Sequence, residues 1–182
     1  MVEGARTDAQ RSADAILNAA RDVLARDPSA GLGVIAERAG VHRATVYRHF
    51  PTREALVDGL YAAYLEDLAA GIRKTDLDAD DLWPELEGVT RRIYEVTLAW
   101  RAYAWAPHYS AATRAAQPEL AAIMSTLMGA LQMQGRLRQD LSVRELAVTW
   151  GAPIQFLAAR IAEGDTTVDR IVDYVLRLLS PA

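Results

Sequence analysis

The fold of this chain is decided by one run of sequence, Val34-Ile-Ala-Glu-Arg-Ala-Gly40-Val-His-Arg-Ala-Thr45-Val-Tyr-Arg-His-Phe50-Pro-Thr-Arg-Glu-Ala-Leu56. A helix-turn-helix needs a small inward residue on its first helix, a glycine at the turn, an apolar residue after the turn, and a second helix with a free outer face. Four residues of the run meet these requirements in order: Ala36, Gly40, Val41 and Val46. The run therefore predicts two short helices, over 32–39 and 43–50, joined by a left-handed turn.

The second of these helices has an apolar side and a polar side. Val46 and Phe50 lie four positions apart and therefore point inward together. The other side chains are mostly hydrogen-bond donors and aromatic groups, which suit phosphates and base edges. They are Arg43, Ala44, Thr45, Tyr47, Arg48 and His49. The helix thus has the character of a recognition helix for double-stranded DNA.

The distribution of charge agrees with this interpretation, although the formal net charge is −4. Residues 1–54 hold eight arginines against seven acidic residues, whereas residues 55–182 hold twelve basic and seventeen acidic residues. Within residues 38–53 there are four arginines and no acidic residue, a cluster that a phosphate backbone attracts. Each of these arginines, taken alone, is also compatible with an ordinary solvated surface position.

The run resembles the DNA-binding signature of the tetracycline-repressor (TetR) family, which has Ile-Ala, Ala-Gly-Val, Thr-hydrophobic-Tyr and His-Phe followed by a basic residue at these separations. The resemblance is strong over about residues 12–60. Beyond them it rests on the helical pattern and on the phrase Gly135-Arg-Leu-Arg-Gln-Asp-Leu-Ser142 before a long helix. It implies an all-α homodimer whose last two long helices pair in a four-helix interface, with a ligand-responsive pocket between the domains.

The resemblance also implies roles for single residues. Arg43 and Ala44 fall where the family reads bases. The positions where it contacts phosphates or nearby bases are occupied by Thr45, Tyr47 and His49, and the position of its phosphate-clamping lysine by Arg53. The sequence departs from the pattern twice: His42 stands where a serine often caps the recognition helix, and Leu32-Gly33 where a hydroxyl residue often touches phosphate. We include His42 among the candidate DNA-binding residues.

Hydrophobic periodicity along the whole chain predicts an all-α fold of about nine helices. We expect an N-terminal three-helix DNA-binding domain over 1–54, a connecting helix over 53–72, and a C-terminal ligand-binding and dimerisation domain over 55–182. After a polar connector at 73–81, further helices are expected over 83 to about 107, 108–116, 118–134, 142–163 with a kink or split at Pro153, and 166–179. The expected helix caps are Ser12, Thr52, Ser142 and Thr166, with turns at Gly135 and Gly164.

Aromatic and methionine residues concentrate in the second domain, as they do around small-molecule pockets. They also fit plain core packing, since they recur at helical spacing. The candidate ligand-binding residues are Trp100, Tyr103, Trp105, Tyr109, Met124, Met128 and Trp150. The ligand expected there is a small, mostly apolar effector of unknown identity.

The last helix is too apolar for a single neighbour, which predicts that it and the preceding helix pair with a second copy of the chain around a two-fold axis. The candidate interface residues are Leu146, Ile154, Leu157, Ile161, Ile171, Val175 and Leu178.

The composition argues against other classes of protein. The chain has no cysteine, three scattered histidines, no glycine-rich phosphate loop and no Gly-x-Ser-x-Gly motif, so we expect no enzyme, metal site or cofactor. No apolar stretch is long enough for a membrane span or a signal peptide, which favours a cytoplasmic protein without a membrane partner. The predicted function is a repressor that an effector releases from a palindromic operator. An activator of the same fold and a helical protein-interaction module are the alternatives.

Overall fold

The computed structural model describes residues 2–100 and 118–181, with side chains from residue 8 onward except at 119 and 155. Every regular element within these ranges is a helix, as the sequence predicts. The helices are α1 (Val2–Leu24), α2 (Leu32–Ala39), α3 (Arg43–His49), α4 (Arg53–Ile72), α5 (Trp83–Ala99), α7 (Pro118–Met133), α8 (Val143–Gly151), α9 (Ile154–Ala162) and α10 (Val168–Leu179). The predicted helix at 108–116 and three candidate ligand-binding residues, Tyr103, Trp105 and Tyr109, lie outside the described residues. No helix in the described ranges is long and apolar enough to cross a membrane.

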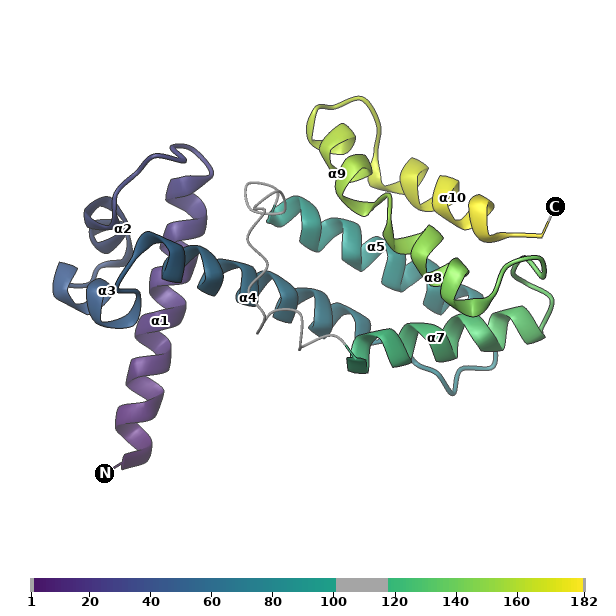
Figure 1. Cartoon of the computed structure of the whole chain (residues 1–182), viewed down its shortest axis with the longest axis horizontal. Helices are drawn as coiled ribbons and strands as arrows, with labels where there is room; N and C mark the ends of the chain where they lie inside the picture. The colour runs from purple at the N-terminus through teal and green to yellow at the C-terminus, as the bar shows by residue number, and fades with distance from the viewer. Residues whose placement is uncertain (1, 101–117, 182) are drawn as a thin grey trace.

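Two separate cores organise the helices. In Figure 1, α1, α2 and α3 gather at one end of α4, while α5 and α7–α10 gather toward the other end. The first core is made of side chains from α1, α2, α3 and the first half of α4. The second core is made of side chains from the end of α4, from α5 and from α7, α8, α9 and α10. Within the second group, α5 lies between α4 on one side and α9 and α10 on the other.

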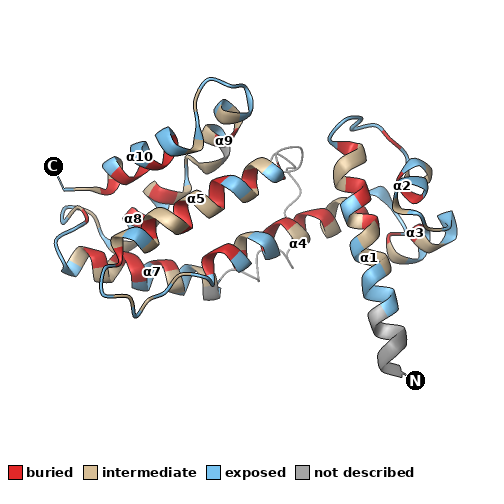
Figure 2. Cartoon of the chain, turned by 180° about the vertical axis from the view of Figure 1, so that it is seen from behind, coloured by how far each residue is buried: buried red, intermediate tan, exposed pale blue. Residues whose placement is uncertain are grey.

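Helix α4 belongs to both cores. Its residues Leu56, Leu60 and Leu65 are buried in the first core, and Ile72 is buried in the second. Leu68 packs against both of them. The alternation of buried and exposed segments along α4 can be followed in Figure 2. The first core therefore extends past the predicted domain boundary at residue 54, because the connecting helix supplies much of its apolar surface.

Several helix ends follow the local signals in the sequence. The three glycines expected at turns, Gly40, Gly135 and Gly164, have positive φ angles. The side chain of Thr52 accepts a hydrogen bond from the amide of Ala55, and Ser142 forms a reciprocal capping box with Glu145. The predicted split at Pro153 separates α8 from α9.

Three predicted helix ends were wrong. Ser12 does not cap the first helix, because α1 already begins at Val2 and the Ser12 hydroxyl donates to the Asp8 carbonyl within it at 2.9 Å. The cap of α10 is Thr167, one residue after the predicted Thr166, since its hydroxyl accepts from the Arg170 amide at 3.4 Å. Helix α5 ends at Ala99 and not near residue 107, because the Trp100 backbone leaves the helical conformation.

Gly59 allows α4 to approach the other helices of the first core. A Cβ atom at this position would lie 2.8 Å from Cε1 of Phe50 and 3.2 Å from Cδ2 of Leu17. We predict that Gly59→Ala lowers the free energy of unfolding by about 1 kcal/mol or more, because overpacking outweighs the gain in helix propensity. Urea unfolding followed by circular dichroism measures this change.

The matched control is Gly129→Ala in α7, where the nearest atom to a new Cβ would be Cγ2 of Val143 at an ordinary 3.7 Å. This variant should be more stable by about 0.5–1 kcal/mol, since alanine restricts the unfolded chain and glycine does not. Equal gains in stability for both variants would contradict the close approach at Gly59.

Candidate nucleic-acid interface

The turn between α2 and α3 fixes the direction of α3. Gly40 ends α2 in the left-handed conformation, with a φ of +66°, which a side chain would strain. The amide of Val41 then donates to the Ala36 carbonyl at 3.1 Å, closing the turn. Val46 is fully buried and Phe50 nearly so, which anchors the inner side of α3 to the first core. The motif therefore has the geometry that its sequence predicts.

The start of α3 is capped by His42. Its Nδ1 accepts a hydrogen bond from the Ala44 amide at 3.2 Å, so the imidazole takes over the capping role of the more usual serine. This bond requires an unprotonated Nδ1, which leaves Nε2 as the donor of the ring. His42 itself is exposed.

The outer side of α3 carries an exposed group of donors. Arg43, Ala44, Tyr47 and Arg48 are exposed, and Thr45 is half-buried beside them. The Arg43 guanidinium donates to the Tyr47 hydroxyl at 3.2 Å and lies over the Tyr47 ring, 5.6 Å from its centroid. Because guanidinium has five N–H groups, this contact leaves most of the Arg43 donors available to a ligand. Arg48 has no ion pair or hydrogen bond to the described residues.

His49, predicted to contact phosphate, is half-buried at the end of α3. Its Nε2 is enclosed and has no hydrogen-bond partner within the described ranges. The ring stacks obliquely near Phe50, with 6.3 Å between the centroids. In this structure His49 is thus closer to the core than the other candidate residues of α3.

Arg53, the predicted phosphate clamp, binds the protein itself. Its guanidinium donates to the Ala30 carbonyl at 2.8 Å and to the Pro28 carbonyl, both in the loop between α1 and α2. In the same loop, the hydroxyl and amide of Ser29 donate to Asp27 and lower the pKa of that carboxyl. Arg53 therefore ties this loop to the start of α4.

The candidate ligand-binding residues are divided between the two cores. Met124, Met128 and Trp150 are buried together in the second core. The Trp150 indole donates to the Thr90 hydroxyl at 2.9 Å, and this hydroxyl donates to the Leu86 carbonyl at 2.6 Å. Trp100 does not join them: it is buried in the first core, against α1 and α4. Helical periodicity missed this difference because it shows that a residue is buried but not in which core.

Tyr94 on α5 is a residue that the sequence analysis did not select. It is 1% exposed in the second core, and its hydroxyl has no hydrogen-bond partner among the described residues. Burial raises the pKa of Tyr94, because the phenolate would lose its hydration. A buried hydroxyl without a hydrogen-bond partner is unusual in a folded protein.

The candidate dimer residues are also divided. Leu146 and Val175 are fully buried within the chain, so a second copy cannot reach their side chains, and Ile171 is nearly buried. Ile154, Leu157, Ile161 and Leu178 are half-buried. Two exposed aromatic residues of α9 and α10 were not selected from the sequence: Phe156 is 64% and Tyr174 46% exposed.

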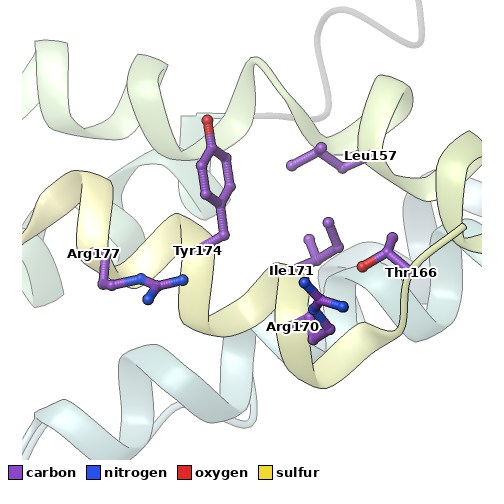
Figure 3. A pocket seen from close by; sticks show the side chains of 6 residues that line it. All are labelled: Leu157, Thr166, Arg170, Ile171, Tyr174 and Arg177. Atoms are coloured by element: carbon purple, nitrogen blue, oxygen red, sulfur yellow. The ribbon is translucent and has the colours of Figure 1, made fainter.

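A shallow pocket of about 280 Å³, lined in part by Tyr174, lies between α9 and α10. Figure 3 shows its lining residues, Leu157, Thr166, Arg170, Ile171, Tyr174 and Arg177. Arg177 pairs with Asp173 at 2.9 Å, so part of the positive charge is already neutralised. This surface is therefore mixed, with apolar positions between charged ones.

These features together define a helix-turn-helix protein, in which a long helix joins a small DNA-reading unit to a larger helical body. Residues 16–60 match the family model described as "Bacterial regulatory proteins, tetR family". The chain is 41% identical over 90 residues to the HTH-type transcriptional repressor LfrR of Mycolicibacterium smegmatis, an alignment that covers 49% of this chain and 45% of LfrR. Residues 16–60 are therefore similar to the DNA-binding part of TetR-family regulators, and the alignment with LfrR spans about half of this chain and less than half of that relative.

Solved structures are similar to most of this chain. A TetR transcriptional regulator from Streptomyces coelicolor superimposes with a TM-score of 0.61 at 27% identity, over 93% of this chain and 99% of that one. The fatty acid degradation regulator FadR from Bacillus halodurans reaches a TM-score of 0.71 at 20% identity, over 92% and 94% of the two chains, and shows the shared fold. The Streptomyces coelicolor protein is described as a transcriptional regulator and LfrR as a transcriptional repressor.

Proposed function

We propose that this chain is a transcriptional repressor that binds a palindromic operator as a homodimer and is released by a small, mostly apolar effector. The observation that carries the proposal is the exposed donor side of α3, held outward by Val46 and Phe50. Repression, rather than activation, is supported by the name of its relative LfrR. A protein that binds chromosomal DNA acts in the bacterial cytoplasm.

The proposal gives different tasks to the residues of α3. Arg43 and Ala44, in the first turn, would face base edges, because a helix in the major groove brings its N-terminal residues to the bases. Thr45, Tyr47 and Arg48 would contact the phosphates on either side. His42 would hold the helix start, with His49 supporting its end and Arg53 keeping the α1–α2 loop in place.

The test is a set of DNA affinities at several salt concentrations, on a duplex that the wild-type chain selects from a random pool and on a scrambled duplex. Arg48→Ala should weaken binding to both duplexes and reduce the slope of log affinity against log salt by about 1. Arg43→Ala should instead reduce the preference for the selected duplex, by about tenfold, since a bidentate arginine contact discriminates between bases. Lys74→Ala, an exposed charge in the connector after α4, is the control and should change neither quantity.

Arg53→Ala separates the two roles of that residue in the same measurements. If Arg53 holds the α1–α2 loop, its replacement should lower the melting temperature and leave the slope of log affinity against log salt unchanged. A slope reduced by about 1 would instead assign Arg53 to phosphate, as the family resemblance implies. A wild-type chain that prefers no duplex over the scrambled one would contradict the proposed function altogether.

The dimer is supported by the exposed apolar residues of α9 and α10. One seven-residue recognition helix offers little surface for specific binding, and a two-fold dimer places a second one about 34–36 Å away, in the next major groove on the same side. Phe156 and Tyr174 are exposed aromatic residues on neighbouring helices, next to the half-buried Leu157 and Leu178. Aromatic residues with this exposure are typical anchors of an interface.

Phe156→Glu should therefore raise the dimer dissociation constant by at least about thirtyfold, because it places a charge in an apolar contact. Sedimentation velocity measures the oligomeric state, and circular dichroism checks that the helices are retained. Met133→Glu is the matched control, since Met133 is 87% exposed at the end of α7, outside the proposed interface. A wild-type chain that sediments as a monomer at micromolar concentration would rule out the dimer.

The effector is supported by the Tyr94 hydroxyl in the second core, which has no hydrogen-bond partner among the described residues. Met124 and Met128 belong to the same apolar cluster, so a ligand beside Tyr94 would meet apolar side chains and one enclosed hydroxyl. A site of this composition binds an apolar molecule that carries a hydrogen-bond acceptor. The proposed effector is therefore a hydrophobic compound with one carbonyl, ether or similar oxygen.

Thermal shifts of wild type and Tyr94→Phe with medium-chain 2-alkanones, and with alkanes of equal length as controls, test this proposal. The ketones should stabilise the wild type more than the variant, because only tyrosine donates to the carbonyl. Without ligand, Tyr94→Phe should be at least as stable as wild type, whereas Tyr64→Phe should lose about 1 kcal/mol because its hydroxyl bonds to Thr97 at 3.3 Å. A wild type stabilised equally by ketones and alkanes would contradict an anchoring role for Tyr94.

A further inference from the structure

Trp100 lies where the two cores of the molecule meet. Most of α5 belongs to the second core, through residues such as Leu86, Val89 and Ile93. The end of the same helix turns to the other core: Val96 packs against it, and Trp100 is buried in it with 3% exposure. Trp100 is therefore a side chain of the helical body that is inserted into the DNA-reading unit.

The surroundings of Trp100 come from two helices of the first core. Its indole N–H donates to Oδ2 of Asp67 on α4 at 2.7 Å, and its ring centroid is 6.2 Å from that of Tyr64 on the same helix. From α1, the guanidinium carbon of Arg21 lies 5.1 Å from the Trp100 ring centroid. One turn earlier on α5, the Thr97 hydroxyl is 3.3 Å from that of Tyr64.

These contacts supply a second attachment between the two parts of the molecule. If α4 were the sole connection, the DNA-reading unit could rotate relative to the body whenever that helix bent or rolled. The contact between Trp100 and Arg21 reaches α1, which lies across α4 (Figure 1), and so restrains rotation about α4. Attachment at two places that do not share an axis fixes an orientation.

We propose that Trp100 is a positioning residue that sets the angle between the DNA-reading unit and the helical body, and through it the operator spacing that the dimer accepts. The proposal rests on the proposed function as a dimeric DNA-binding repressor. The two recognition helices of such a dimer must enter grooves one helical turn apart, so a fixed angle admits one spacing of half-sites. A duplex with a different spacing is bound only if the contacts of Trp100 are broken.

The chain provides a matched control, Trp150. Both tryptophans are nearly buried, with 3% and 7% exposure, and both donate an indole hydrogen bond to a neighbouring oxygen. The partner of Trp150 is Thr90, so its bond joins two helices of the body and does not reach the DNA-reading unit. Replacing each tryptophan by phenylalanine thus removes an indole hydrogen bond from two different places, to a carboxylate at Trp100 and to a hydroxyl at Trp150.

The experiment compares two duplexes, one selected by the wild-type chain from a random pool and the same duplex with one base pair inserted between its half-sites. In the wild type, binding to the lengthened duplex breaks the charge-assisted hydrogen bond between Trp100 and Asp67. Trp100→Phe lacks this bond from the start, so it should bind the lengthened duplex more tightly. The ratio of the two affinities should therefore fall by up to about tenfold. Asp67→Ala should narrow the ratio in the same way, and as an exposed residue it can be replaced without disturbing either core. Trp150→Phe should leave the ratio at its wild-type value.

Partial unfolding of a variant does not change the ratio of the two affinities, because it lowers the fraction of active protein equally in both measurements. The role of Trp100 would be overturned if Trp100→Phe and Asp67→Ala kept the wild-type ratio of affinities, or if Trp150→Phe lowered that ratio equally. Either result would leave the proposed function intact. A wild-type chain that selects no duplex with two half-sites would overturn the proposed function itself.

Discussion

Everything in this molecule depends on α4 being buried at both ends in different cores. The helix has 20 residues, which corresponds to a length of about 30 Å. Leu56 and Leu60 hold its start in the DNA-reading unit, and Ile72 holds its end in the helical body. Because close-packed cores transmit displacement instead of absorbing it, a shift of the body against α4 is carried to the unit that presents α3. The side-chain contacts of Trp100 decide how freely the unit follows.

The recognition helix depends on this framework because it is too short to be stable alone. A helix of seven residues has few internal hydrogen bonds, and its formation in isolation is unfavourable. Its inner residues Val46 and Phe50, the cap from His42 and the turn at Gly40 supply what the helix lacks. The outer side of α3 does not pack against the core, so Arg43 and Arg48 are available to a ligand.

Three buried residues with hydroxyl groups lie at helical spacing along one face of α5, and they differ in their hydrogen bonding. The hydroxyl of Thr90 is bonded to Trp150 and that of Thr97 to Tyr64, so one joins two helices of the body and the other joins the body to α4. Tyr94 lies between them, and its hydroxyl has no hydrogen-bond partner in the part of the chain that the structure describes. Satisfied polar groups in a core stabilise one arrangement, whereas an unsatisfied one lowers the stability of the folded state.

The amino-acid sequence by itself determined the local elements: the turn at Gly40, the inner side of α3, the capping box at Ser142 and the break at Pro153. These depend on residues within a few positions of one another, where steric limits and short-range hydrogen bonds act. Only the tertiary structure decided which core a buried residue joins, as for Trp100, and which partner a charged group takes, as for Arg53. These depend on contacts between residues more than twenty positions apart, and periodicity carries no information about them because it reports burial without naming the neighbour.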